Sequence, residues 1–113
     1  MTDPYPTEAQ LESIRGFVGT PHALVSRLRE MWWPEGDYYI SDELIQDHKV
    51  VEVRLATGGW SGNEQIVSEL RGTFFYLIYW HMTQRGGLHA FHIPAERYDA
   101  EQDLGSLLPA TRG

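Results

Sequence analysis

The sequence predicts an α+β fold, in which a small antiparallel sheet of about three strands packs with two or three short helices. Three observations support this prediction. Apolar residues recur at helical spacing in the first third, residues 50–57 alternate between apolar and polar, and two aromatic stretches flank a Gly-Gly pair. At 113 residues, we expect a single domain, 1–113, with one hydrophobic core.

Two helices are expected over residues 7–33, after a flexible arm at residues 1–6 that contains two prolines. Thr7 has the side chain to cap the first helix. Thr20 precedes Pro21 at the start of the second, and proline is favoured at the first helical position because its missing N–H would be unpaired there anyway. The following segment is ambiguous: residues 38–40 are compatible with a short extended segment and residues 42–46 with a turn of helix.

Residues 50–94 are expected to form a strand, helix and hairpin core. Val51, Val53 and Leu55 lie on one face of the predicted strand, and a short amphipathic helix follows it. The hairpin is predicted from "TFFYLIYWHMTQ" and "LHAFHIP", joined by a two-residue Gly86-Gly87 turn. The tail, 95–113, is expected to be loosely packed.

The formal net charge of −7 argues against direct binding to nucleic acid, where clustered basic residues supply most of the affinity. The acidity is compatible with a basic protein partner, and equally with a role in solubility alone. With no cysteine there are no disulfides or thiolate zinc sites. No apolar run approaches the ~20 residues that span a bilayer. We therefore expect a cytoplasmic protein with no membrane segment and no cofactor.

The glycine-rich corner "GGWSGNE", residues 58–64, lies between the predicted strand and helix. Ser61 and Glu64 have the spacing of a capping box, in which each side chain accepts a hydrogen bond from the other residue's backbone N–H. A phosphate site would need those N–H groups free and is usually followed by a lysine, which is missing here. Asn63 also stands where a nucleophile elbow has glycine. The corner is therefore predicted to be structural.

Trp60, at the tip of this corner, has two readings. One is a plug over the core whose indole N–H bonds a backbone carbonyl. The other is an exposed anchor for a protein partner, because Trp and Arg dominate interface hot spots. Further interaction candidates are Trp33 at the end of the second helix, Phe75 and Tyr79 on one face of the predicted hairpin, and Arg85 at its turn.

His81 and His92 face each other across the hairpin if Gly86-Gly87 is its turn. Two imidazoles are fewer than the three protein ligands of a usual catalytic zinc. Glu52, or Asp47 and His48, could supply a third. The alternative is an ordinary histidine pair on a partly exposed sheet face, so no metal site is predicted.

The string "LATGGWSGNEQIV", followed by an aromatic strand and "RGGLHAFHIP", resembles short uncharacterised proteins of bacteriophages and prophages. The resemblance covers residues 50–94 and implies an accessory protein that modulates a host protein. It carries over no catalytic residue.

We therefore expect a non-enzymatic protein-binding module. One specific form is an inhibitor of a host nucleic-acid-binding defence complex, as anti-CRISPR proteins are. The alternatives are a small metal-dependent enzyme using His81 and His92, and a homo-oligomeric structural or assembly component such as a homodimer.

Overall fold

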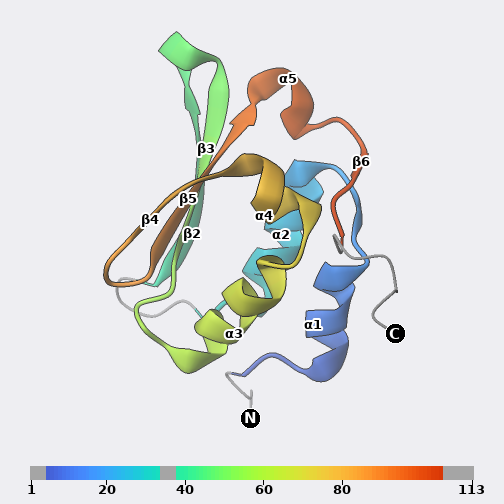
Figure 1. Ribbon diagram of the computed structural model, residues 1–113, viewed down its shortest axis with the longest axis vertical. Coiled ribbons are helices and arrows are strands. Elements are labelled where there is room, and N and C mark those ends of the chain that lie inside the picture. Colours follow the sequence, from blue (N-terminus) through green and yellow to red (C-terminus); the bar gives the residue numbers. More distant parts are fainter. Residues whose placement is uncertain (1–4, 34–37, 106–113) are drawn as a thin grey trace.

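The computed structural model describes residues 5–33 and 38–105 and confirms the α+β class (Figure 1). The helices of this part are α1 (Glu8–Arg15), α2 (Pro21–Met31), α3 (Ser61–Leu70), α4 (Phe74–Tyr79), α5 (Ala95–Tyr98) and a 3-10 turn, η1 (Gln46–His48). The strands are β1 (Val18–Gly19), β2 (Tyr39–Ile45), β3 (Val50–Ala56), β4 (Trp80–Gln84), β5 (Leu88–Pro94) and β6 (Gln102–Asp103).

The main sheet is antiparallel, with the strand order β2-β3-β5-β4, and β1 pairs separately with β6. The alternation predicted for β3 is present: Val51, Val53 and Leu55 are buried, whereas Glu52 and Arg54 are not. The helices lie to one side of this sheet in Figure 1. A sheet covered on one face needs one apolar and one solvent-tolerant face, which this alternation provides.

The predicted caps of the first two helices are confirmed. The Thr7 hydroxyl accepts from Gln10 N at 3.1 Å, and the Gln10 side-chain oxygen accepts from Thr7 N at 2.8 Å, which completes a capping box. Thr20 caps α2 by accepting from Ala23 N at 2.9 Å. These contacts satisfy backbone N–H groups that have no partner inside their own helix.

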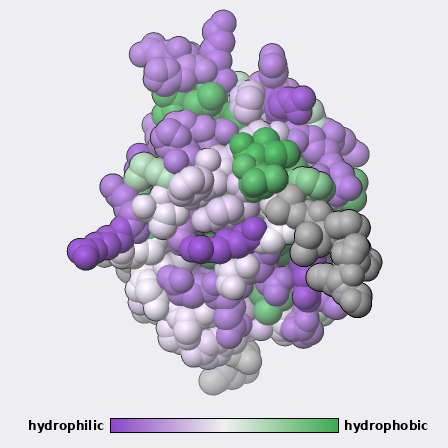
Figure 2. All heavy atoms as spheres, in the orientation of Figure 1, coloured by the Kyte–Doolittle hydropathy of each residue, from purple (hydrophilic) through white to green (hydrophobic). Residues whose placement is uncertain are grey.

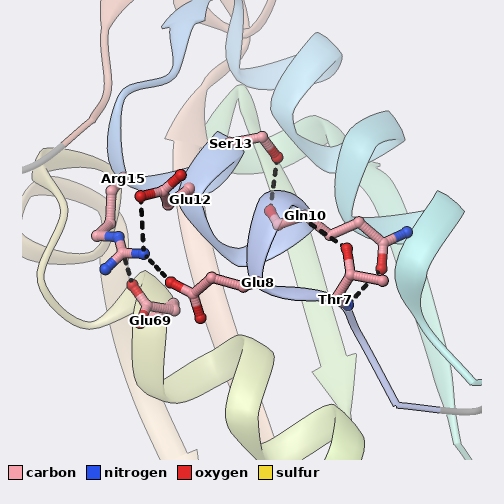
Figure 3. A network of polar contacts seen from close by, with 7 residues as sticks. All are labelled: Thr7, Glu8, Gln10, Glu12, Ser13, Arg15 and Glu69. Atoms are coloured by element: carbon pink, nitrogen blue, oxygen red, sulfur yellow. Dashed lines mark hydrogen bonds and ion pairs between the residues drawn. The ribbon is translucent and has the colours of Figure 1, made fainter.

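Arg15 connects α1 to α3 (Figure 3). Its guanidinium lies 2.9 Å from a Glu8 carboxylate oxygen on its own helix and 3.2 Å from Glu69 on α3. The side chains are partly exposed, so water and salt weaken each ion pair. The ion pairs of Arg15 therefore connect α1 to α3 but add little to the stability of the fold.

The predicted hairpin is present as β4 and β5, but the first half of its first strand is wrong, because residues 74–79 form helix α4. Thr73 caps this helix by accepting from Tyr76 N at 3.2 Å. Phe75 and Tyr79, four residues apart, are buried on the same side. Aromatic residues favour strands by propensity, and a six-residue apolar run carries no periodicity that distinguishes the two structures.

Two other segments are more ordered than the sequence indicates. The ambiguous stretch at 38–46 contains β2, a full edge strand paired with β3. The prediction of a loosely packed tail is wrong for residues 95–105, where Tyr98 and Leu104 belong to the core. Leu104 N also donates to Phe17 O at 3.2 Å, which ties this segment to the region after α1. Residues 106–113 lie outside the described part.

Candidate functional site

The glycine corner is organised by Thr57, a fully buried residue that the sequence did not single out. Its hydroxyl donates to Glu64 Oε2 at 2.6 Å and accepts from Gly59 N at 3.1 Å. Its backbone N–H donates to Gly87 O at 2.9 Å, so the corner is fastened to the β4–β5 turn. One buried threonine therefore satisfies polar groups from both loops.

The capping box predicted at Ser61 and Glu64 is wrong. The helix begins one residue earlier than expected, with Trp60 as its N-cap and no side-chain capping bond. Glu64 points its carboxylate to Thr57 instead, and Ser61 Oγ lies 3.2 Å from the Tyr5 hydroxyl. The carboxylate still lies in the first turn of α3, where an anion is electrostatically favoured.

Two tyrosines cover this corner. The Tyr38 ring packs directly on Gly58, which leaves no room for a Cβ, and Gly58 has φ of +62°. The Tyr5 ring lies 5.0 Å from the Trp60 ring, centroid to centroid. Trp60 is half-buried, and its Nε1 is buried with no hydrogen-bond partner, which differs from the predicted bond to a carbonyl. It is thus closer to a plug than to an exposed anchor.

Asn63, which stands where a nucleophile elbow has glycine, has a structural role. Its side chain is buried, accepts from Trp33 N at 2.9 Å and donates to Trp33 O at 3.1 Å. An amide can satisfy a backbone N–H and C=O together, which a glycine could not. Trp32 is buried in the core and Trp33 is half-buried. The asparagine therefore joins α3 to the end of α2.

The histidine pair comes together, but not by the predicted register. The turn has three residues, Arg85–Gly87, so Gln84 pairs with Leu88 and Met82 with Ala90. An irregularity between Trp80 and Met82 then places His81 beside His92. Their ring centroids are 3.8 Å apart and the planes differ by 9°.

Glu52 is the third member of this cluster on the open face of the sheet. His92 Nε2 donates to Glu52 Oε2 at 2.9 Å, and this hydrogen bond, with Arg54 nearby, holds the pKa of Glu52 below its usual value. Tetrahedral zinc requires nitrogen lone pairs that point at one metal position. The stacked rings of His81 and His92 hold their lone pairs in parallel planes instead. Among residues 5–33 and 38–105, no three His, Asp or Glu side chains have metal-binding geometry.

His89 is a buried histidine that the sequence reasoning left aside. It lies on the core face of β5 with 3% of its surface exposed. Its Nδ1 is 3.1 Å from Thr83 Oγ1, and its Nε2 is buried without a partner. Burial lowers the pKa of His89, with a further contribution from the charge of Arg71. It is therefore expected to stay neutral in the fold.

The two hollows at the ends of the sheet do not contain the histidine pair. One, of about 530 Å³, is lined by Tyr38, Tyr39, Ala56, Gly58, Gly86 and Leu88. The other, of about 470 Å³, lies at the opposite end and is lined by Leu44, Gln46, Lys49, Pro94, Ala95 and Glu96. Neither brings together an acid, a base and a nucleophile as a catalytic site would.

Helix α4 exposes its outer side. Phe75 and Tyr79 are buried, so the prediction that they contact a partner is wrong. Their neighbours are the exposed ones: Leu77 is 65%, Ile78 56% and Trp80 47% exposed. We call these three residues the α4–β4 surface. Figure 2 shows hydrophobic atoms gathered over the part of the molecule that α4 occupies in Figure 1.

Trp80 is held in place by its neighbours. Its ring is stacked on Tyr76, with centroids 6.3 Å apart, and its Nε1 donates to Thr83 Oγ1 at 2.9 Å. A fixed aromatic side chain loses little entropy on binding. Of the residues predicted as interaction candidates, Arg85 is exposed at the β4–β5 turn, at the far end of the same strand.

Within the described ranges, no helix has the length and apolar composition needed to cross a bilayer. Comparison of the chain with protein-family models, with curated proteins and with solved structures found no match.

Proposed function

We propose that this domain binds another protein through the α4–β4 surface. The observation that carries the proposal is the exposure of Leu77, Ile78 and Trp80, three large apolar side chains within four consecutive residues. Large apolar side chains gathered at one exposed place are typical of interaction sites. The rigid Trp80 supplies the aromatic anchor that interface hot spots favour.

Three side chains alone are too few for a stable complex, because a specific interface buries roughly 800 Å² on each partner. The surface continues along β4, which is an edge strand that pairs only with β5 in the main sheet. The Trp80–Gln84 strand is exposed apart from the half-buried Met82. We therefore place the contact along α4 and the outer edge of β4.

The distribution of the acidic side chains argues against the alternative, a contact face made of acidic residues. Many of them are already paired with basic groups, as in Glu69 with Arg15 and Asp42 with Arg29. They are spread over α1, α2, β2, β3, α3 and the segment after β5. An inhibitor of a host nucleic-acid-binding defence complex, such as an anti-CRISPR protein of a phage, stays a prediction. The wide distribution of the acidic residues weakens it.

Affinity capture from a lysate of the source cells, treated with nuclease, tests the proposal. Leu77→Glu places a charge in the α4–β4 surface, and Val18→Glu is a matched control because Val18 is also 65% exposed but lies in β1. We expect a stoichiometric protein to be retained by the wild type and by Val18→Glu and lost by Leu77→Glu. Equal retention by all three would contradict the proposal.

A further inference from the structure

We infer that the partner presents an extended segment in which apolar side chains are flanked by carboxylates, and that this segment lies along the free edge of β4. The inference rests on the proposed function and specifies the chemistry of the partner. It differs from the expectation of a basic partner, which follows from the net charge of the whole chain.

Local charge around the α4–β4 surface is opposite in sign to that of the chain. Residues 70–95 contain Arg71 and Arg85 and no acidic residue, although the chain has 16 acidic residues and a net charge of −7. Of the acids near this segment, Glu69 pairs with Arg15, and Glu52 pairs with His92 and Arg54, whereas Asp103 lies in β6 beside the start of α4 and makes no ion pair with a described residue. The surface is therefore apolar, with Arg71 at one end and Arg85 at the other.

Arg71 is placed to receive a carboxylate beside the apolar side chains. Its guanidinium carbon lies 5.7 Å from the centroid of the Tyr76 ring, and Tyr76 is stacked on Trp80. Arg71 is exposed and makes no ion pair with any residue in the described ranges. A guanidinium pre-positioned on an aromatic face can bind a carboxylate through two parallel hydrogen bonds.

The edge of β4 favours an extended partner. Between Trp80 and Gln84 there is no proline, lysine or acidic residue to protect the edge, and the irregularity between Trp80 and Met82 leaves Met82–Gln84 as its regular part. Arg85 follows at the far end, about 16 Å from Trp80 at the rise of a strand. The opposite edge of the sheet, β2, carries the exposed Glu43, which would repel the same segment. Adding a strand to an open edge is a common mode of peptide recognition.

A second copy of this chain fits less well. Two copies joined by the same surface would bring Arg71 and Arg85 of one close to those of the other, and like charges across an interface are unfavourable. If the acidic segment 96–103 of a second copy were the occupant, the contact would join different surfaces and would not close into a dimer. Both arrangements make the chain self-associate, which the experiment below would detect.

Selection from a displayed library of random peptides, with the full chain as bait, tests the inference. We expect enriched peptides to combine apolar residues with Asp or Glu. A synthetic copy of the most enriched peptide should bind Val18→Glu as it binds the wild type, and bind Leu77→Glu and Arg71→Glu at least about tenfold more weakly. Its affinity should also fall as sodium chloride is raised. Circular dichroism confirms that each variant is folded.

The outcomes separate the two claims. Peptides that need Leu77 but show no acidic excess, or that ignore Arg71→Glu, would overturn the inference and leave the proposed function standing. A library that yields no Leu77-dependent peptide would overturn the inference, and the lysate capture would then decide the proposed function on its own. Sedimentation showing self-association of the wild type, lost in Leu77→Glu, would identify a second copy as the occupant and also overturn the inference.

Discussion

The indole N–H of Trp80 donates a hydrogen bond to Thr83 Oγ1, and that oxygen lies 3.1 Å from Nδ1 of the buried His89. This chain of contacts connects an exposed aromatic side chain to the core face of β5. Trp80 is thus connected, through the exposed Thr83, to the buried His89.

Replacing Thr83 by valine should destabilise the fold by about 1–3 kcal/mol, because the buried His89 Nδ1 loses its partner and the Trp80 indole loses its acceptor. Thr83→Ser keeps the hydroxyl and should retain most of the stability. Urea unfolding of the three proteins measures the difference. Equal stability of Thr83→Val and the wild type would show that the hydrogen-bonded chain contributes nothing.

Replacing Asn63 by alanine should cost about 2–3 kcal/mol, since the Trp33 N–H and C=O both lose their side-chain partner. Gln65→Ala is the control, because Gln65 is an exposed residue on the same helix and its loss should change stability by less than about 0.5 kcal/mol. The midpoints of chemical denaturation give the comparison. Similar losses in the two variants would contradict the role given to Asn63.

Gly58 and Gly59 form a matched pair, since both have positive φ, at +62° and +77°. Gly59→Ala should cost about 1–2 kcal/mol from the backbone alone, because its Cβ would meet open space. Gly58→Ala should cost more, because its Cβ would overlap the Tyr38 ring. In a Tyr38→Ala background the two alanine variants should become equal in thermal stability. A Gly58→Ala penalty that persists there would place the cause elsewhere.

The first two helices and β3 could be predicted from local chemistry. Thr7, Thr20 and the alternation of Val51, Val53 and Leu55 act within a few residues of where they stand. Helix α4 could not be predicted in this way, because an apolar run reads equally as a buried strand and its burial is decided by tertiary packing.

The site features that were missed depend on tertiary contacts outside the local capping pattern. Glu64 bonds Thr57 rather than completing a capping box, and Asn63 bonds the backbone of Trp33. The closeness of His81 and His92 was predicted, yet it arises from an irregular strand beside a three-residue turn. A hairpin pattern fixes such a register only when the turn length is known.

Stability should fall as the pH drops below about 6.5, the ordinary pKa of histidine, because His89 is held neutral by burial. Its pKa is lowered in the fold, so below 6.5 the unfolded chain binds a proton that the folded chain does not. The loss continues until the pH reaches the lowered pKa. The lowered pKa values of Glu52 and Asp42 add a separate loss at more acidic pH, below the ordinary range of carboxylates.

His89→Leu removes the histidine part of this dependence while keeping the site apolar. The free energy of unfolding, measured from pH 7.5 to 5, should therefore fall less in His89→Leu than in the wild type. His48→Ala is the control, since His48 is exposed in η1. Parallel curves for the wild type and His89→Leu would show that His89 titrates alike in both states.

Zinc should leave the melting temperature unchanged, because the stacked rings of His81 and His92 do not aim their nitrogens at a common point. Thermal melts with added zinc and with a chelator test this, on protein purified without a nickel column. A rise in melting temperature with zinc, lost in His81→Ala, would instead support the metal-dependent enzyme.

The most direct test of the account is site-specific photo-crosslinking in the source cells. A benzophenone amino acid replaces Leu77 in one sample and Val18 in another, two positions of equal exposure. The account predicts a discrete crosslinked protein adduct from position 77 and none of the same mass from position 18. Adducts that are the same from both positions, or found only from position 18, would contradict the claim that α4 and β4 form the binding surface.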